Sequence, residues 1–310
     1  MKNMLNTMLS GLRLRQLQLL IALDEYRSLH KAATALSMTQ SAASKALHEL
    51  ESILEERLFD RSPRGVVPNQ FGSRMIRYAR LMAADLSTLC DDLVDLRSGH
   101  GVRLAVGAIM GAMSNLAVPA LLRLRELQPD IAIEIVEGTS AELLRHLDEG
   151  RLDIVIGRSS VSADKAKYLY LPLGEEPLSV VAGPGHAAAS KPGLTLRDLA
   201  GQNWISYPTG MPLRTLLERE FDLAGIPTPP QCIATASTYA TLAMLQQRDK
   251  LVALLPTHTA NIFSAHGLIR ILPIPLRSPA QTLGIVTRSG SSLPEPAERL
   301  IELLRECQTE

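Results

Sequence analysis

Hydrogen-bonding side chains without any carboxylate share one stripe of the segment from Met38 to Glu51. Drawn as a helix, this stripe presents Gln40, Ser41, Ser44, Lys45 and His48. The acidic residues of the segment begin only at Glu49. Such a stripe can approach the phosphates and base edges of a nucleic acid, because it holds no acid for the phosphates to repel. The alternative is a small polar helix whose charge layout is accidental.

The side-chain types on this stripe suit contacts with duplex DNA. The amide of Gln40 can pair bidentately with adenine, and the ammonium of Lys45 can reach guanine or a phosphate. The hydroxyls of Ser41 and Ser44 and the imidazole of His48 can donate to base edges or backbone oxygens.

Short helices must position this stripe. Apolar periodicity predicts helices over residues 12–28 and 29–37, the first with Leu14, Leu17, Leu20 and Ile21 on one face. A tight connection at Ser37–Met38 follows, and Thr39 is the expected N-cap of the helix that carries the stripe. The apolar side of that helix holds Ala43, Leu47, Leu50 and Leu54. Two short helices joined by a short turn are typical of a helix-turn-helix.

Two further segments support a DNA-binding head. "LFDRSPRGVVPN" combines an apolar anchor with Arg61, Arg64 and a Pro/Gly turn. This is the composition of a β-wing whose arginines bind phosphate, although such arginines are often only solvated.

The next segment spaces apolar residues by four and three, in a heptad pattern that ends at Gly99. The residues of this pattern are Met75, Ala79, Met82, Leu86, Leu89, Leu93 and Leu96. The pattern predicts a helix that pairs with a second chain, and the alternative is a helix packed on its own domain.

Charge is distributed unevenly along a chain whose formal net charge is zero. Residues 1–80 hold 12 Lys and Arg against 7 Asp and Glu, so the head is basic and the remainder is acidic. The three cysteines are far apart, and no Cys/His cluster indicates zinc or another cofactor. No signal peptide or membrane-spanning run is expected, so we predict a cytoplasmic protein without a membrane role.

From Val102 onward, short apolar strands alternate with amphipathic helices, which predicts an α/β domain with parallel or mixed sheets. We expect the strands to fall into two lobes that the chain crosses between, the first crossover lying near "YLYLPL". No nucleotide-binding, hydrolase or metalloprotease motif is present, so an enzyme is not expected. A solute-binding protein remains an alternative for this domain alone, but the basic helical head disfavours it.

These segments together resemble the LysR-type transcriptional regulators. The resemblance lies in "LRLRQLQLLIAL", "SLHKAATALSMTQSAASKALHELE" and "LFDRSPRGVVPNQFG", over some sixty residues. Within that family they are similar to the branch that contains the galactose-binding-protein regulator. The chain departs from the usual pattern at Ser41, where Pro is common, and at Glu55, where Gly is common. Pro68–Asn69 replaces the usual Leu-Thr, and Asn69 can serve as the N-cap instead.

The resemblance implies an overall α/β protein: a winged helix-turn-helix (mainly α) with a linker helix, followed by a type II periplasmic-binding-protein-like α/β domain of two lobes. The expected domains are 11–68 for DNA binding, 69–98 for dimerisation and 101–310 for effector binding. Lobe I would take about 101–170 and 277–310, and lobe II about 171–276. The implied DNA contacts are Thr39, Gln40, Ser41, Ser44, Lys45, His48, Arg61 and Arg64.

In such folds a ligand lies where loops leave the carboxyl ends of strands. Four loops meet this condition, although plain helix capping is the alternative for each Ser or Thr. Their candidate effector-binding residues are Met110, Gly111, Ala112, Met113, Thr139, Ser140, Tyr207, Thr209, Gly210, Met211, Ser237 and Thr238. Ala112 stands where carboxylate-binding relatives often have Ser, which weakens a dicarboxylate and leaves neutral sugars and aromatic ligands open.

The expected protein is therefore a transcriptional activator or repressor whose DNA binding is controlled by a small molecule. Its expected partners are double-stranded DNA with two-fold half-sites, an effector (a sugar, sugar acid or aromatic acid), and further copies of itself in a dimer or tetramer. RNA polymerase is a further candidate partner.

Overall fold

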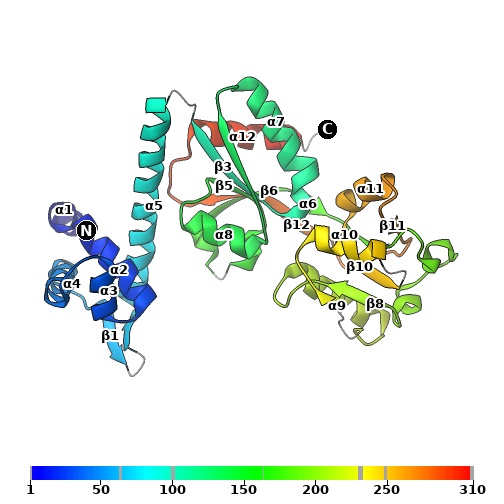
Figure 1. The fold of residues 1–310 in the computed structure, drawn as a ribbon, viewed down its shortest axis with the longest axis horizontal. Coiled ribbons are helices and arrows are strands. Elements are labelled where there is room, and N and C mark those ends of the chain that lie inside the picture. Colours follow the sequence, from blue (N-terminus) through cyan, green and yellow to red (C-terminus); the bar gives the residue numbers. More distant parts are fainter. Residues whose placement is uncertain are drawn as a thin grey trace. The chain divides into compact units, whose positions relative to one another are not determined.

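The computed structural model describes residues 2–62, 65–98, 102–162, 164–229, 233–247 and 250–307. The chain forms two compact units, a head that covers the chain up to Gly99 and a body that covers most of the rest. Each unit is described by itself (Figure 1). None of the described helices is both long and apolar enough to cross a bilayer.

The head is built on four helices, α1 (Lys2–Gly11), α2 (Leu14–Tyr26), α3 (Leu29–Ala35) and α4 (Gln40–Leu54). Leu17 and Leu20 of α2 are buried with Leu50 of α4, as the periodicity predicts. Leu14, which was expected on the same face, is 58% exposed, because it stands at the first position of the helix. Helix α1 was not expected from the sequence, since its Asn and Thr residues interrupt its apolar pattern.

The turn before α4 and the wing after it have the expected forms. Thr39 caps α4, and its hydroxyl accepts from the backbone N–H of Ala42 at 3.2 Å. Strands β1 (Phe59–Ser62) and β2 (Gly65–Pro68) pair antiparallel. Gly65 has φ +102°, and a Cβ there would lie 2.2 Å from the carbonyl oxygen of Arg27, so only glycine fits this approach.

Asn69 caps helix α5 (Gln70–Ser98), as expected: its Oδ1 accepts from the N–H groups of Phe71 and Gly72. Only some residues of the heptad pattern are exposed and so available to contact a partner chain. Ala79 is fully buried in the core of the head and Met75 packs against that core, so the first part of the pattern serves intramolecular packing. For the fully buried Ala79 the prediction of a dimer contact is wrong, whereas for the partly buried Met75 it stays a prediction.

The later part of the pattern is exposed in the single chain. Met82 and Leu86 are each 40% exposed, Leu89 is 51% exposed and Leu93 is 47% exposed. The side chain of Leu96 lies outside the described side chains.

The body contains two five-stranded sheets. Lobe I has the order β4-β3-β5-β12-β6, in which β3, β4 and β5 are parallel and β12 is antiparallel to both of its neighbours. Its strands are β3 (Arg103–Ala108), β4 (Ala132–Glu137), β5 (Ile154–Gly157), β6 (Tyr168–Glu176) and β12 (Gln281–Arg288). Helices α7 (Val118–Leu127), α8 (Ser140–Asp148) and α12 (Glu295–Glu306) pack on this sheet. Short α6 (Met110–Ala112) and a π-helical segment (Met113–Ala117) lead from β3 into α7.

Lobe II has the order β11-β7-β10-β8-β9. Its strands are β7 (Leu178–Ala182), β8 (Asn203–Ser206), β9 (Ile233–Ala234), β10 (Leu251–Pro256) and β11 (Arg270–Ile271). The fully buried run of β10 alternates between two cores: Val252 and Leu254 pack with α9 (Pro212–Ala224), whereas Ala253 and Leu255 pack with α10 (Thr238–Gln247) and α11 (Thr257–Ala265). Every residue of β10 is apolar because both faces of this central strand are covered.

The expected first crossover near "YLYLPL" is wrong. These residues form β6, which pairs along its length with β12 in lobe I. The chain leaves lobe I only after Glu176, and Pro177 joins β6 to β7. The expected lobe boundary between residues 170 and 171 therefore falls inside a strand, because pairing with β12, far away in the sequence, decides where the strand ends.

Glu55 offers a test of backbone strain in the head. It ends α4 with φ +58°, a left-handed conformation in which a Cβ is unfavourable. We expect Glu55→Gly to stabilise α4 by about 0.5–1 kcal/mol, the relief of strain less the extra freedom that glycine has when unfolded. Native-state hydrogen exchange of the α4 amides in the full chain measures this change. Glu56→Gly removes a neighbouring charge without this relief and should destabilise; equal effects of the two changes would contradict the strain.

Candidate functional site

The polar stripe of α4 lies on the outer surface of the head. Gln40, Ser41, Ser44, Lys45 and His48 are all exposed, and the opposite side of the helix is buried at Ala43, Leu50 and Leu54. The side chain of Lys45 is 80% exposed, and its Nζ lies 4.0 Å from a carboxylate oxygen of Glu49, so this ammonium is free to turn toward another anion. The acids after the stripe include Glu51, whose carboxylate accepts from the N–H of Leu58 at 2.8 Å and so holds the wing.

Of the two wing arginines, the structure describes only the backbone of Arg61. The backbone of Arg61 lies in β1, opposite Val66 of β2. Arg64 lies outside the described residues.

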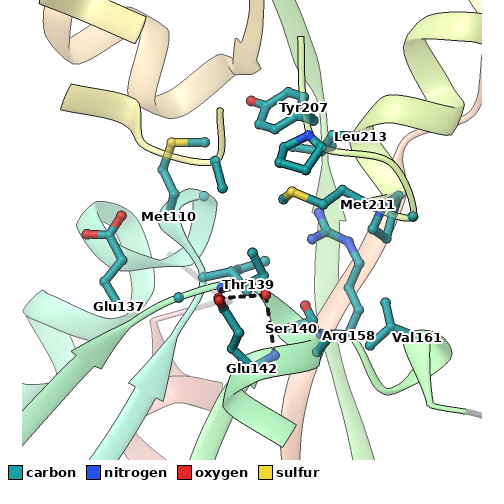
Figure 2. A pocket seen from close by; sticks show the side chains of 18 of the residues that line it. Met110, Glu137, Thr139, Ser140, Glu142, Arg158, Val161, Tyr207, Met211 and Leu213 are labelled. Carbon is teal, nitrogen blue, oxygen red and sulfur yellow. Dashed lines mark hydrogen bonds between the residues drawn. The ribbon is translucent and has the colours of Figure 1, made fainter. Parts of the chain in front are cut away.

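The body has a cavity of about 700 Å³ lined by both lobes (Figure 2). This volume suits a small-molecule ligand, for which pockets of about 300–1,000 Å³ are usual. Nine of the residues expected from the sequence line it, namely Met110, Gly111, Thr139, Ser140, Tyr207, Thr209, Gly210, Met211 and Ser237. Figure 2 shows Met110 on one side of the opening, with Tyr207 and Met211 on the other.

Three expected residues do not line the cavity. Ala112 is fully buried in the lobe I core, and Met113 packs against the same core, because the helix turns them away from the opening. The hydroxyl of Thr238 contacts the sulfur of Met110 and so ties α10 to α6.

Helix capping occupies two of the expected hydroxyls. Thr139 donates from its hydroxyl and its N–H to the carboxylate of Glu142, at 2.8 and 3.0 Å, and caps α8 in return. Ser237 accepts from the N–H of Ala240 at 3.2 Å. The simple capping alternative is therefore correct for these side chains, although both also lie at the cavity.

A buried ion pair at the cavity was missed by the sequence reasoning. The Nη2 of Arg158 donates to Glu176, and their side chains are only 7% and 4% exposed. The Nε of Arg158 and the Oε1 of Glu176 are buried without a hydrogen-bond partner in the described chain. Burial lowers the pKa of Arg158, but an arginine starts so high that its guanidinium stays charged at neutral pH. The available signal was a charged residue directly after the buried strand "DIVIG".

Neighbouring residues fix this ion pair. The hydroxyl of Ser140 accepts from the N–H of Arg158 at 3.2 Å. A Cβ on Gly111 would lie 1.5 Å from the Oε1 of Glu176, so the backbone of Gly111 packs directly on the carboxylate. Tyr207 donates from its hydroxyl to the carbonyl of Leu254 at 2.8 Å, and burial raises the pKa of Tyr207, so its phenol stays neutral as a wall of the cavity.

The charges that line the cavity are mostly negative. Three acidic residues line it, Glu137, Glu142 and Glu176, together with one basic residue, Arg158. Hydrogen bonds from Thr139 lower the pKa of Glu142, which keeps this carboxyl ionised at neutral pH. Within the described residues, no three His, Cys, Asp or Glu side chains are grouped as a metal ion would require.

A helix-turn-helix head followed by a two-lobed body with a cavity is the architecture of a ligand-controlled transcriptional regulator. Residues 14–73 match the model of the bacterial regulatory helix-turn-helix protein, lysR family, and residues 97–308 match that of the LysR substrate binding domain. The chain therefore belongs to the LysR family of transcriptional regulators, as the sequence resemblance implied.

Relatives and solved structures agree with this assignment. The chain is 36% identical to the HTH-type transcriptional regulator GbpR of Azospirillum brasilense, over 95% of this chain and 86% of that protein. It is 26% identical to the HTH-type transcriptional regulator PcaQ of Agrobacterium fabrum, over 96% of both chains. The fold is similar to that of CbnR, a LysR family transcriptional regulator, with a TM-score of 0.59 at 19% identity over 96% of this chain and 100% of that chain.

The ion pair predicts a strong effect of removing one charge. We expect Glu176→Gln to lower the free energy of unfolding by about 3–5 kcal/mol, because it leaves the buried guanidinium of Arg158 without an anion. Urea unfolding of the full chain, followed by circular dichroism, measures this loss. The control is the double change of Arg158→Met with Glu176→Leu, which leaves no unpaired charge and should cost clearly less. A double variant as unstable as Glu176→Gln would show that packing, not charge, explains the loss.

Proposed function

We propose that this protein is a sequence-specific DNA-binding regulator whose α4 enters the major groove and whose activity a small molecule in the body cavity controls. The observation that carries the proposal is the exposed, acid-free stripe of α4, held outward by a buried apolar side. Its hydrogen-bonding groups match those that read base edges. The alternative is a small-molecule-binding protein or enzyme without a DNA role. That alternative does not explain why the exposed stripe of α4 holds hydrogen-bonding groups and a lysine but no acid.

Within this proposal the head contributes two kinds of DNA contact. Gln40, Ser44 and Lys45 contact base edges, while Thr39, Ser41 and His48 contact bases or phosphates. Arg61 and Arg64 of the wing bind phosphates beside the groove. Phosphate contacts of this kind position the head and make its affinity depend on salt.

We propose that two chains pair through the exposed part of α5. Met82, Leu86, Leu89 and Leu93 leave a stripe of apolar surface along this helix that water disfavours. A second copy presents the same stripe, so an isologous pair covers both and sets two heads for two-fold half-sites. Further assembly through the bodies gives a tetramer, which acts in the cytoplasm and can contact RNA polymerase.

The charges of the cavity favour a neutral effector. A carboxylate would enter beside Glu137 and Glu142, whereas the hydroxyls of a sugar can donate to these acids and accept from Arg158. The relative GbpR is the galactose-binding protein regulator, which agrees with a sugar. Of the three classes open from the sequence, we therefore propose a sugar over a sugar acid or an aromatic acid at this cavity. Binding between the lobes biases their relative setting and, through it, the DNA contacts.

Base reading by α4 is tested with a duplex selected from a random pool by the full-length protein. We expect Gln40→Ala to lose about 1–3 kcal/mol of binding free energy on the selected duplex and much less on unselected DNA. Ser52→Ala, on the same helix beyond the stripe, should change neither. Equal losses on selected and unselected duplexes would show that Gln40 reads no base, and the absence of any retarded complex at low salt would refute DNA binding.

Pairing through α5 is tested by sedimentation. Leu89→Asp introduces a charge into the exposed apolar stripe, so we expect the dimer to dissociate at micromolar concentration. Ser87→Asp adds the same charge to the same helix away from Leu89 and should leave the dimer intact. An unchanged association state of the Leu89 variant would rule out this interface.

The effector class is tested by thermal unfolding of the full chain with D-galactose and D-galacturonate, which differ in one carboxylate. We expect galactose to raise the melting temperature more, since ligands that bind only the folded state stabilise it and the acidic lining disfavours the uronate. Thr209→Trp, which fills the cavity from an exposed position, should remove the shift. A larger shift with the uronate would contradict a neutral effector.

A further inference from the structure

The segment between β3 and α7 packs into both lobes within a few residues. Met110, the first residue of α6, packs against the lobe II cluster that contains Leu245 and Ala260. Met113, three residues further on, packs against the core of lobe I. Met110 therefore reaches from the lobe that carries it into the other one, and Figure 2 shows it at the side of the cavity.

A π-helical segment, Met113–Ala117, follows α6 directly and leads into α7. A π-turn holds one residue more than an α-turn. Removing that residue would therefore rotate α6 by about 100° and shift it by about 1.5 Å relative to α7. Ala117 is fully buried in the lobe I core, which fixes the α7 end of the segment. The extra residue thus determines the direction in which Met110 points.

Several polar atoms at this place are buried without a hydrogen bond. Within the described part of the chain, the Oγ of Ser114 and the Oδ1 of Asn115 have no partner. Helix α11 contacts both α6 and the π-helical segment, and the Oγ1 of its Thr259 is buried and unpaired as well. A buried polar atom without a partner costs free energy, because it has lost its hydrogen bonds to water. The contact between the lobes is therefore less stable here than a fully paired one.

The two residues at the start of α6 link this contact to the effector cavity. The hydroxyl of Thr238 in α10 donates to the sulfur of Met110 and so holds it in lobe II. Gly111 packs on the carboxylate of Glu176, where the Cβ of any other residue would collide with the Oε1. Met110 and Gly111 both line the effector cavity. A molecule in the cavity therefore contacts the residues on which the position of α6 depends.

We propose that Met110 is a latch between the lobes. In the ligand-free protein it holds α6 of lobe I to α10 and α11 of lobe II, and the effector displaces it from the lobe II cluster. The ligand binds the released state more tightly, since it does not compete there with Met110. Helix α6 turns at the π-helical segment while α7 stays in lobe I, and the lobes change their relative setting. This inference rests on the proposed function, because it assigns the moving part of the same cavity.

The latch is tested by DNA affinity of the full chain without ligand, on the duplex that the protein selects. Met110→Ala removes the latch, and Met113→Ala is the matched control, because it removes the same side chain from the lobe I core. We expect Met110→Ala to change the affinity at least about fivefold, as release by the effector would, and Met113→Ala to change it less than about twofold. Circular dichroism establishes that both variants are folded.

The movement of Met110 is followed by NMR of the full chain with isotopically labelled methionine methyl groups. Met110→Leu assigns the signal. Deletion of Ser114 removes the extra residue of the π-helical segment and should move the Met110 signal to the position of an exposed methionine. Thr238→Val removes only the hydroxyl that holds the sulfur, and it should shift the signal partway in the same direction. Saturating D-galactose should move the signal of the unaltered protein likewise.

Two results would overturn the latch. One is a Met110 signal that keeps its buried position in both the Ser114 deletion and Thr238→Val, and the other is an equal DNA affinity of Met110→Ala and Met113→Ala. A signal that responds to both variants but not to galactose supports the latch and counts against the sugar. If the unaltered protein retards no DNA, the DNA-binding proposal fails, and the Met110 signal by itself confirms or overturns the latch.

Discussion

The pairing of Arg158 with Glu176 is the constraint around which the ligand-binding part of the body is organised. Neither charge could be buried alone, because removing an unpaired ion from water costs several kcal/mol even after the protein relaxes. The pair also fixes its surroundings: Gly111 must lack a side chain beside the carboxylate, and Ser140 must accept from the backbone of Arg158. Glu176 ends β6 immediately before the chain crosses to lobe II, so the charge that holds Arg158 also lies at the junction of the lobes.

The head solves a different problem, since it must expose polar groups without losing its core. Buried alanines lie among the leucines of its core, with Ala32, Ala33 and Ala43 all at most 1% exposed. Among the acids that follow the stripe, Glu51 stabilises the head, because its carboxylate accepts a hydrogen bond from the backbone N–H of Leu58. The order of residues along α4, first donors without acids and then acids, therefore separates the proposed DNA contacts from the contacts that hold the wing.

Features set by local sequence were predicted well. The caps at Thr39 and Asn69, the buried side of α4 and most strands of the body follow from hydrogen-bonding side chains and apolar periodicity within a few residues. The failures share one cause. Ala79 is buried by α2 rather than by a second chain, and "YLYLPL" forms β6 because it pairs with β12. The hydroxyl of Thr139 donates to Glu142 and caps α8. Each of these outcomes depends on a segment far away in the sequence or on a neighbouring side chain. The apolar periodicity of one segment does not predict such contacts.

The sequence by itself determined the family, the order of most helices and strands, and four loops that all contribute to one cavity. These features depend on local propensities and motifs. Only the tertiary structure decided that Arg158 and Glu176 meet and that Ala112 and Met113 turn away from the cavity into the core of lobe I. The physical reason is that a buried charge needs its partner in space, and the strands that bring Arg158 and Glu176 together are ordered by the sheet and not by the chain.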